Sequence, residues 1–108
     1  MMSPNALSSD RRLAYECMAD ISPETYRAAI ECTVTFERRA DLSNIRVPTL
    51  AVAGEADTIA AASMMEKMAR KIPGCRHVCL PKLGHLANLE DPQAFNSVLT
   101  DFLSTVRN

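Results

Sequence analysis

Residues 47–60 of the chain, VPTLAVAGEADTIA, decide the fold. The uncharged apolar run at residues 49–53 is typical of a short strand buried on both faces, and such strands belong to parallel sheets covered by helices. Pro48 stands at the first position of this strand, where a missing N–H is tolerated. Gly54 follows directly and opens a polar loop that contains Asp57. The stretch therefore predicts a buried parallel strand with a functional loop at its carboxyl end.

The residues that follow predict the rest of a strand–helix–strand–helix unit. Apolar side chains recur at helical spacing within residues 60–72, and a Pro-Gly pair directly afterwards ends that helix. A second short apolar run at residues 77–80 predicts another strand. Residues 92–106 carry apolar side chains at i, i+3, i+4 and i+7, the stripe of an amphipathic helix. Because a helix joins the two strands, we expect them to be parallel, with a right-handed crossover.

The N-terminal part predicts a separate helical segment. Residues 1–9 are rich in Ser, Asn and Pro, and we expect them to be loose. Ser22 and Pro23 are the residue types of a helix N-cap and first turn, so helices are expected at about 10–19 and 23–36. The expected organisation is a loose N-terminus at 1–9, a helical segment at 10–40, and the strand–helix–strand–helix portion at 41–108.

Length and composition favour one compact domain and exclude some classes of partner. The 108 residues are too few for two domains. With 12 basic and 13 acidic residues the net charge is -1, so no basic excess drives nucleic-acid binding. No stretch has the length of a membrane-spanning helix, and the N-terminus lacks the apolar core of a signal peptide. We therefore expect a cytoplasmic protein whose four cysteines are reduced.

The polar loops after the two predicted strands carry the candidate catalytic residues. Asp57 follows the first strand and His85 follows the second. Because the carboxyl ends of parallel strands share one edge of a sheet, these two side chains can meet. A carboxylate bonded to one imidazole nitrogen orients the ring and leaves the other nitrogen to act as a base. An alternative stays open at this point, in which Asp57 caps the next helix and His85 is an ordinary loop residue.

Two stretches resemble the C-terminal part of the α/β-hydrolase superfamily. They are VPTLAVAGEADTIA at residues 47–60 and LPKLGHLANLEDPQAFNSVLTDFL at residues 80–103. A G-x-x-D motif runs from Gly54 to Asp57, and G-H followed by N-x-E-x-P runs from Gly84 to Pro92. Within the superfamily, the sequence of these two stretches looks most like that of 3-oxoadipate enol-lactonases and related esterases. The resemblance implies that Asp57 and His85 are the acid and the histidine of a Ser…Asp…His triad.

The resemblance also implies a fold class and an activity. The expected class is α/β, a partial α/β-hydrolase fold of two short parallel strands with flanking helices, in which residues 10–40 resemble the end of a helical cap. The expected substrate is a small ester or lactone, and no cofactor or metal is implied. The nucleophile elbow G-x-S-x-G is absent from the sequence. We therefore expect the chain to be inactive alone and to act on substrate only if the missing N-terminal part is supplied.

Several residues allow rival interpretations. Glu55 lies beside Asp57, but alternation turns it to the other side of the loop, so Asp57 is the preferred acid. Cys75, His77 and Cys79 alternate along the second strand and are zinc-binding residue types, although Cys75 follows a Pro-Gly pair that places it outside the predicted strand. A second class of function also stays open, a non-catalytic module that serves as a structural or interaction domain.

The predicted sheet has too few strands to stand alone. The strand at 49–53 has only the strand at 77–80 to pair with, so its other edge exposes unpaired N–H and C=O groups. Two-stranded sheets are marginal in water. Neither a proline nor a charge within residues 49–53 blocks pairing with another chain. We therefore expect a homo-oligomer in which a partner covers the open edge.

Overall fold

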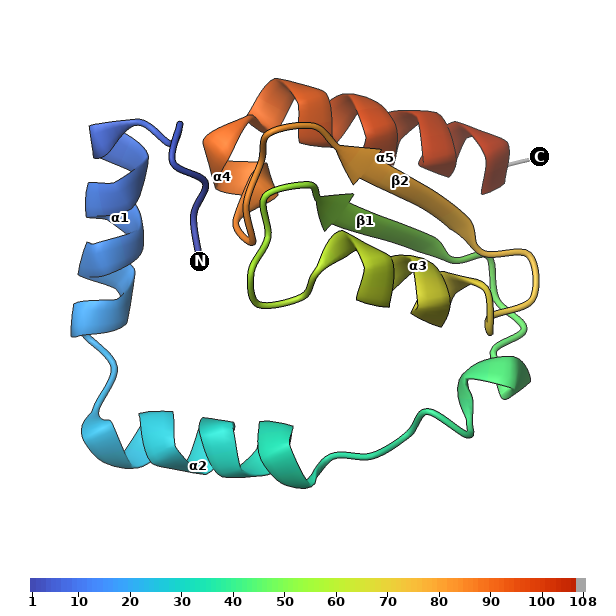
Figure 1. Cartoon of the computed structure of the whole chain (residues 1–108), viewed down its shortest axis with the longest axis horizontal. Helices are drawn as coiled ribbons and strands as arrows, with labels where there is room; N and C mark the ends of the chain where they lie inside the picture. Colours follow the sequence, from blue (N-terminus) through green and yellow to red (C-terminus); the bar gives the residue numbers. More distant parts are fainter. Residues whose placement is uncertain (107–108) are drawn as a thin grey trace.

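The computed structural model describes residues 1–106 and contains a two-stranded parallel sheet, which lies between helices in the upper right part of Figure 1. Strand β1 (Leu50–Gly54) pairs with strand β2 (Arg76–Leu80), with Leu50 opposite Arg76 and Gly54 opposite Leu80. Both predicted strands and their parallel pairing are confirmed, with strand ends that differ by at most one residue from those expected. The register brings the carboxyl ends of the two strands side by side.

Helices cover the sheet and complete an α/β layer. Helix α3 (Ala62–Ala69) connects the two strands and packs on both, while helix α5 (Pro92–Val106) packs on β2 from the other side (Figure 1). An ion pair between Arg76 of β2 and Asp101 of α5, with 2.7 Å between Nη1 and Oδ2, crosses that contact. The buried apolar core consists of small and aliphatic side chains, namely Ala51, Ala53, Ala69, Ile72, Leu80 and Ala87.

The two N-terminal helices lie outside this layer. Helices α1 (Ser8–Ala19) and α2 (Pro23–Thr35) confirm the two helices predicted in this region, but neither contains a buried residue. Figure 1 shows α1 to the left of the sheet and α2 below it, both apart from the sheet. The radius of gyration is 15.5 Å, above the roughly 13 Å of a compact domain of about 100 residues. The compact part of the chain is therefore the α/β layer.

The first residues of the chain pack against its C-terminal region, so the expectation of a loose N-terminus is wrong for them. Ser3 is only 1% exposed, and its backbone N–H donates to the Glu90 carboxylate, 3.1 Å from Oε2. The carbonyl of Met1 accepts the backbone N–H of His85 at 2.7 Å. Local composition suggested a loose segment because it carries no information about partners so distant along the chain.

Two single-turn helices lie outside the helices predicted from the sequence. They are the 3-10 helix η1 (Leu42–Asn44) and helix α4 (Ala87–Glu90). A single turn is too short to show an apolar period, so no sequence pattern marks it. Across residues 1–106, no helix combines the length and the apolar character needed to cross a membrane.

Helix α2 depends on its N-terminal cap, because tertiary contacts bury none of its residues. The Ser22 hydroxyl accepts the backbone N–H of Thr25 at 3.1 Å. Helices shorter than about 12–15 residues are marginal in water, so we expect Ser22→Ala to cost about 1 kcal/mol of helix stability and to speed amide hydrogen exchange in α2. Ser9→Ala is the control, since the Ser9 hydroxyl bonds only to Asp10 inside α1. Unchanged exchange in α2 of the Ser22 variant would contradict this role of the cap.

Candidate active site

Backbone hydrogen bonds join the two loops that leave the carboxyl ends of β1 and β2. The N–H of Glu55 donates to the carbonyl of Leu80 at 2.9 Å, and the N–H of Ala56 donates to the carbonyl of Leu83 at 2.8 Å. The Glu55 carboxylate in turn accepts the backbone N–H of Lys82 at 2.8 Å. Glu55 thus supports the second loop, which accounts for this side chain turning away from the preferred acid.

Two glycines allow close approach around the site, Gly54 between the two loops and Gly84 toward the N-terminal segment and Glu90. A Cβ on Gly54 would clash with the carbonyl oxygen of Gly84 and would lie 2.5 Å from that of Leu83. A Cβ on Gly84 would lie 2.5 Å from the backbone nitrogen of Ser3 and 2.8 Å from the Glu90 carboxylate. A side chain at Gly54 would therefore push the two loops apart, and one at Gly84 would displace the N-terminal segment or the Glu90 carboxylate.

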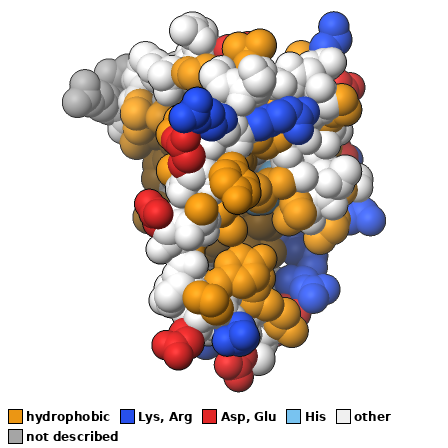
Figure 2. Space-filling model, turned by 90° about the vertical axis from the view of Figure 1, so that its left-hand side faces the viewer, with side chains coloured by type: hydrophobic (Ala, Val, Ile, Leu, Met, Phe, Trp, Pro, Cys, Tyr) orange, Lys and Arg blue, Asp and Glu red, His pale blue; other side chains and the backbone are white. Residues whose placement is uncertain are grey.

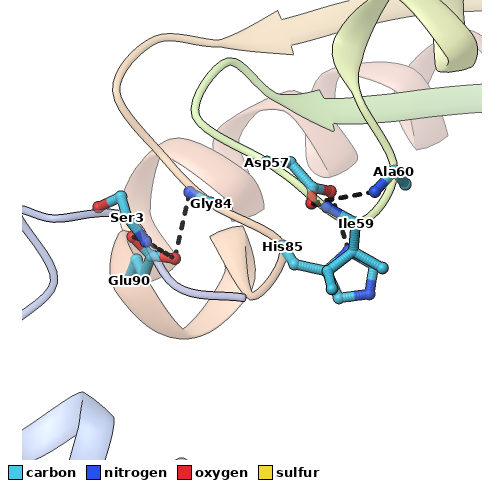
Figure 3. Close-up of polar contacts among 7 residues, drawn as sticks. All are labelled: Ser3, Asp57, Ile59, Ala60, Gly84, His85 and Glu90. Carbon is cyan, nitrogen blue, oxygen red and sulfur yellow. Dashed lines mark hydrogen bonds and ion pairs between the residues drawn. The ribbon is translucent and has the colours of Figure 1, made fainter.

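The approach of the loops brings Asp57 and His85 together. Asp57 Oδ2 lies 2.8 Å from His85 Nδ1 (Figure 3). The Asp57 side chain is 6% exposed, whereas the His85 side chain is 38% exposed. The predicted meeting of these two side chains is confirmed. The carboxylate is buried behind the ring, and Nε2 is the nitrogen left to exchange a proton.

The second oxygen of Asp57 holds its own loop. Oδ1 accepts the backbone N–H of Ile59 at 2.8 Å and that of Ala60 at 3.1 Å (Figure 3). The alternative in which Asp57 caps the next helix is wrong, because α3 begins with Ala61 as its N-cap and no side chain bonds there. Asp57 instead fixes the turn that precedes the helix, with one oxygen for the turn and one for His85.

The surroundings of Asp57 favour its charged form. Burial raises the pKa of the Asp57 carboxyl, but the hydrogen bonds from His85 and from the backbone N–H groups of Ile59 and Ala60 outweigh burial and leave the pKa below its ordinary value. Asp57 is therefore an anion at neutral pH. An anion at this distance makes Nδ1 the protonated nitrogen of a neutral His85.

A small pocket of about 170 Å³ adjoins the pair. Asp57 and His85 form part of its lining, and Val52, Met65 and Phe95 supply apolar surface. A wider, open depression of about 350 Å³ runs along α2 alone and contains neither member of the pair. The small pocket is therefore the place where a reacting group can contact the imidazole.

The residues considered for zinc do not gather into a site. Within the described chain, residues 1–106, no three His, Cys, Asp or Glu side chains come together as a metal-binding group. Cys75 is half-buried, while Cys79 is exposed. The Nε2 atom of His77 is buried without a hydrogen-bond partner in the described residues. This strand contributes packing rather than a cluster of ligands.

Sequence reasoning missed the contribution of Ser3 and overlooked the structural use of Glu90. Both lie beside Gly84, and Figure 3 shows them on the opposite side of that glycine from the His85 ring. The Ser3 hydroxyl points away from the imidazole there, so Ser3 is not placed as a nucleophile. The N-x-E-x-P motif was the available signal for Glu90, whereas no pattern in the sequence marks Ser3.

No family model matches the chain. The chain is 35% identical over 75 residues to a protein named as a carbamate hydrolase, RutD, of Pseudomonas savastanoi pv. phaseolicola, over 69% of this chain and 29% of that relative. It is 27% identical over 92 residues to 3-oxoadipate enol-lactonase 1 of Acinetobacter baylyi, over 85% of this chain and 34% of that relative. The structure of the enol-lactonase from Burkholderia xenovorans LB400 matches with a TM-score of 0.78 and 25% identity, over 94% of this chain and 42% of that one.

The relatives and the structural neighbours are α/β-hydrolases, and the chain is similar in sequence and in its partial fold to the C-terminal part of that superfamily. Within the superfamily, it is similar to carbamate hydrolases, 3-oxoadipate enol-lactonases and esterases. The chain spans about a third of the length of the curated relatives that it matches.

The lowered pKa of Asp57 makes the stability of the chain depend on pH. Since the unfolded chain binds more protons than the folded chain around the ordinary pKa of an aspartate, the stabilisation is present above that value and is lost as pH falls through the lowered pKa. We expect Asp57→Asn to lower the free energy of unfolding by about 1–3 kcal/mol at about pH 7, with a difference that shrinks below about pH 4. Urea unfolding of both proteins across this range measures the effect.

The matched control for this experiment is Asp41→Asn. Asp41 forms an exposed ion pair with Arg38 at 3.5 Å, so its loss should change the free energy of unfolding by less than about 1 kcal/mol at any pH. A constant difference between the Asp57 variant and the wild type down to about pH 3 would be inconsistent with a contribution from the ionised carboxylate.

Proposed function

We propose that the chain supplies the acid and the base of a hydrolase site that acts on a small carboxylic ester or lactone. The observation that carries this proposal is the 2.8 Å contact between Asp57 Oδ2 and His85 Nδ1, at the carboxyl ends of two parallel strands. Support comes from the relatives, which are named as hydrolases of a carbamate, a lactone or an ester. In each of these compounds a carbonyl group is the point of attack.

In the proposed mechanism, His85 acts as general base and then as general acid. Asp57 accepts a hydrogen bond from Nδ1–H, and this leaves Nε2 free to take the proton of a hydroxyl nucleophile as that oxygen attacks the substrate carbonyl. The imidazolium formed in this step is stabilised by the adjacent carboxylate. Nε2 then returns the proton to the leaving oxygen, and a second cycle with water releases the acid product.

The nucleophile and the oxyanion-hole donors of this mechanism are not residues of the 108-residue sequence, which has no G-x-S-x-G elbow. The proposal therefore assigns them to the part of an α/β-hydrolase that this chain does not span. A base with its orienting acid forms no acyl intermediate without them.

The activity experiment compares the chain alone with the chain co-expressed with a polypeptide that carries the G-x-S-x-G part of a related enol-lactonase. Alone, the chain should hydrolyse p-nitrophenyl acetate no faster than its His85→Ala variant. In the co-expressed pair we expect turnover, and His85→Ala should lower it by about 10²-fold or more. His77→Phe is the control, because it removes the other histidine of the chain and keeps a ring of similar size.

Besides an absence of turnover in the co-expressed pair, two results would contradict the proposal. Turnover by the chain alone that His85→Ala abolishes would show that a nucleophile lies within these residues. Turnover in the co-expressed pair that survives both His85→Ala and Asp57→Asn would show that this pair is not the acid and base of the site.

A specific observation also favours a second candidate, a non-catalytic module that functions by self-association. In the described residues, β1 has β2 as its single partner, so one edge of β1 is free. Apolar side chains on α2 are exposed as well, with Val34 at 78% and Ile30 at 46%, and Figure 2 shows hydrophobic side chains on the face that it draws. In this proposal, a second copy of the chain covers the free edge and the apolar helix face, and a homodimer results.

Sedimentation equilibrium across a concentration series tests self-association. We expect the weight-average mass to rise from that of one chain toward that of two as concentration increases. Val34→Lys should shift the transition to higher concentration, because a charge on the exposed helix face opposes its burial. The control is Arg12→Gln, on the exposed surface of α1. A single-chain mass at every concentration, with cooperative unfolding, would be the contrary result.

A further inference from the structure

Glu90 accepts backbone hydrogen bonds from two segments, the loop that carries His85 and the N-terminal segment. Its Oε1 atom accepts the backbone N–H of Gly84 at 3.1 Å. The backbone N–H of Ser3 donates to both carboxylate oxygens, at 3.2 Å to Oε1 and 3.1 Å to Oε2 (Figure 3). A carboxylate that accepts several N–H bonds forms stronger hydrogen bonds than a neutral acceptor. Glu90 therefore ties the residue immediately before His85 to a separate segment of the chain.

The local structure places Glu90 for this contact. Helix α4 begins two residues after His85 and ends at Glu90, whose backbone N–H donates to the carbonyl of Leu86 at 3.0 Å. This single turn folds the chain back, so that the Glu90 side chain reaches the loop that the chain has just left. The lack of a side chain on Gly84 leaves room, since a Cβ there would lie 2.8 Å from Oε1.

The backbone of His85 is thus fixed at two consecutive amides. The Gly84 N–H is bonded to Glu90, and the His85 N–H is bonded to the carbonyl of Met1 at 2.7 Å. Among residues 1–106, the imidazole forms one side-chain hydrogen bond, with Asp57. The His85 side chain is partly exposed, so packing alone does not hold the ring, and its position depends on the backbone from which it extends.

We propose that Glu90 is a positioning residue for His85, which holds the Gly84 amide and thereby fixes the backbone from which the imidazole reaches Asp57. Glu90 does not touch the ring, so it acts through the loop. The role in catalysis rests on the function proposed above, but the positioning itself is a property of the chain and can be measured without turnover.

The test uses the full chain labelled with ¹⁵N and two NMR readouts. The first is the amide hydrogen exchange rate of Gly84, and the second is the signal of the His85 Nδ1 proton that is bonded to Asp57. We expect Glu90→Ala to speed exchange at Gly84 by about tenfold or more and to weaken or abolish the Nδ1 proton signal. Glu90→Gln should largely preserve both readouts, because its carbonyl oxygen can accept the Gly84 N–H.

Two further variants separate reach and charge from general stability. Glu90→Asp keeps the charge but shortens the side chain by one methylene, so it should behave like Glu90→Ala. Asp91→Ala is the matched control, because Asp91 is the adjacent carboxylate and accepts a backbone N–H from Ala94 at 2.9 Å at the start of α5. It should weaken α5 while leaving both readouts at Gly84 and His85 unchanged.

Each other result overturns the proposal. Faster exchange at Gly84 with an unchanged Nδ1 proton signal would show that Glu90 only stabilises the loop. Equal effects of the Asp91 and Glu90 variants would show a general loss of stability. If Glu90→Ala does not fold, the contrast between Glu90→Gln and Glu90→Asp decides the question. Absence of turnover in the co-expressed pair would contradict the proposed function and would leave these two measurements standing.

Discussion

The register of the two parallel strands is the constraint on which the candidate site depends. With Gly54 opposite Leu80, β1 and β2 end at the same level, and the loops that follow begin side by side. A slip of the pairing by two residues would move one loop by about 6–7 Å along the strand. A shift of that size would break the 2.8 Å hydrogen bond between Asp57 and His85. The bond between the N–H of Ala56 and the carbonyl of Leu83 holds this alignment beyond the strand ends.

The two carboxylate oxygens of Asp57 have different hydrogen-bond partners, which explains how a short loop can position a charged group. One carboxylate oxygen is used by the backbone of its own turn and the other by the imidazole. The backbone of the turn fixes the direction of the carboxylate independently of His85. The imidazole therefore bonds to an acceptor that is already oriented. The Asp57 carboxylate is thus the buried member of the pair, and the His85 imidazole is the member that solvent can reach.

The parts of the fold that could be predicted are those with a period or a topological rule. The apolar run of β1, the stripe of α5 and the capping residues of α2 follow from local pattern, and the meeting of Asp57 with His85 follows from parallel strands sharing an edge. The single turn of α4 and the burial of Ser3 have no such signal. Their contacts are set by tertiary structure, between segments that the local sequence does not relate.

The tie between Ser3 and Glu90 joins positions 87 residues apart, whereas Asp57 and His85 are 28 residues apart. By the logarithmic dependence of loop-closure entropy on loop length, the longer closure costs about 1 kcal/mol more. During folding, the strand–helix–strand unit and its pair of loops can therefore close before the N-terminal segment docks.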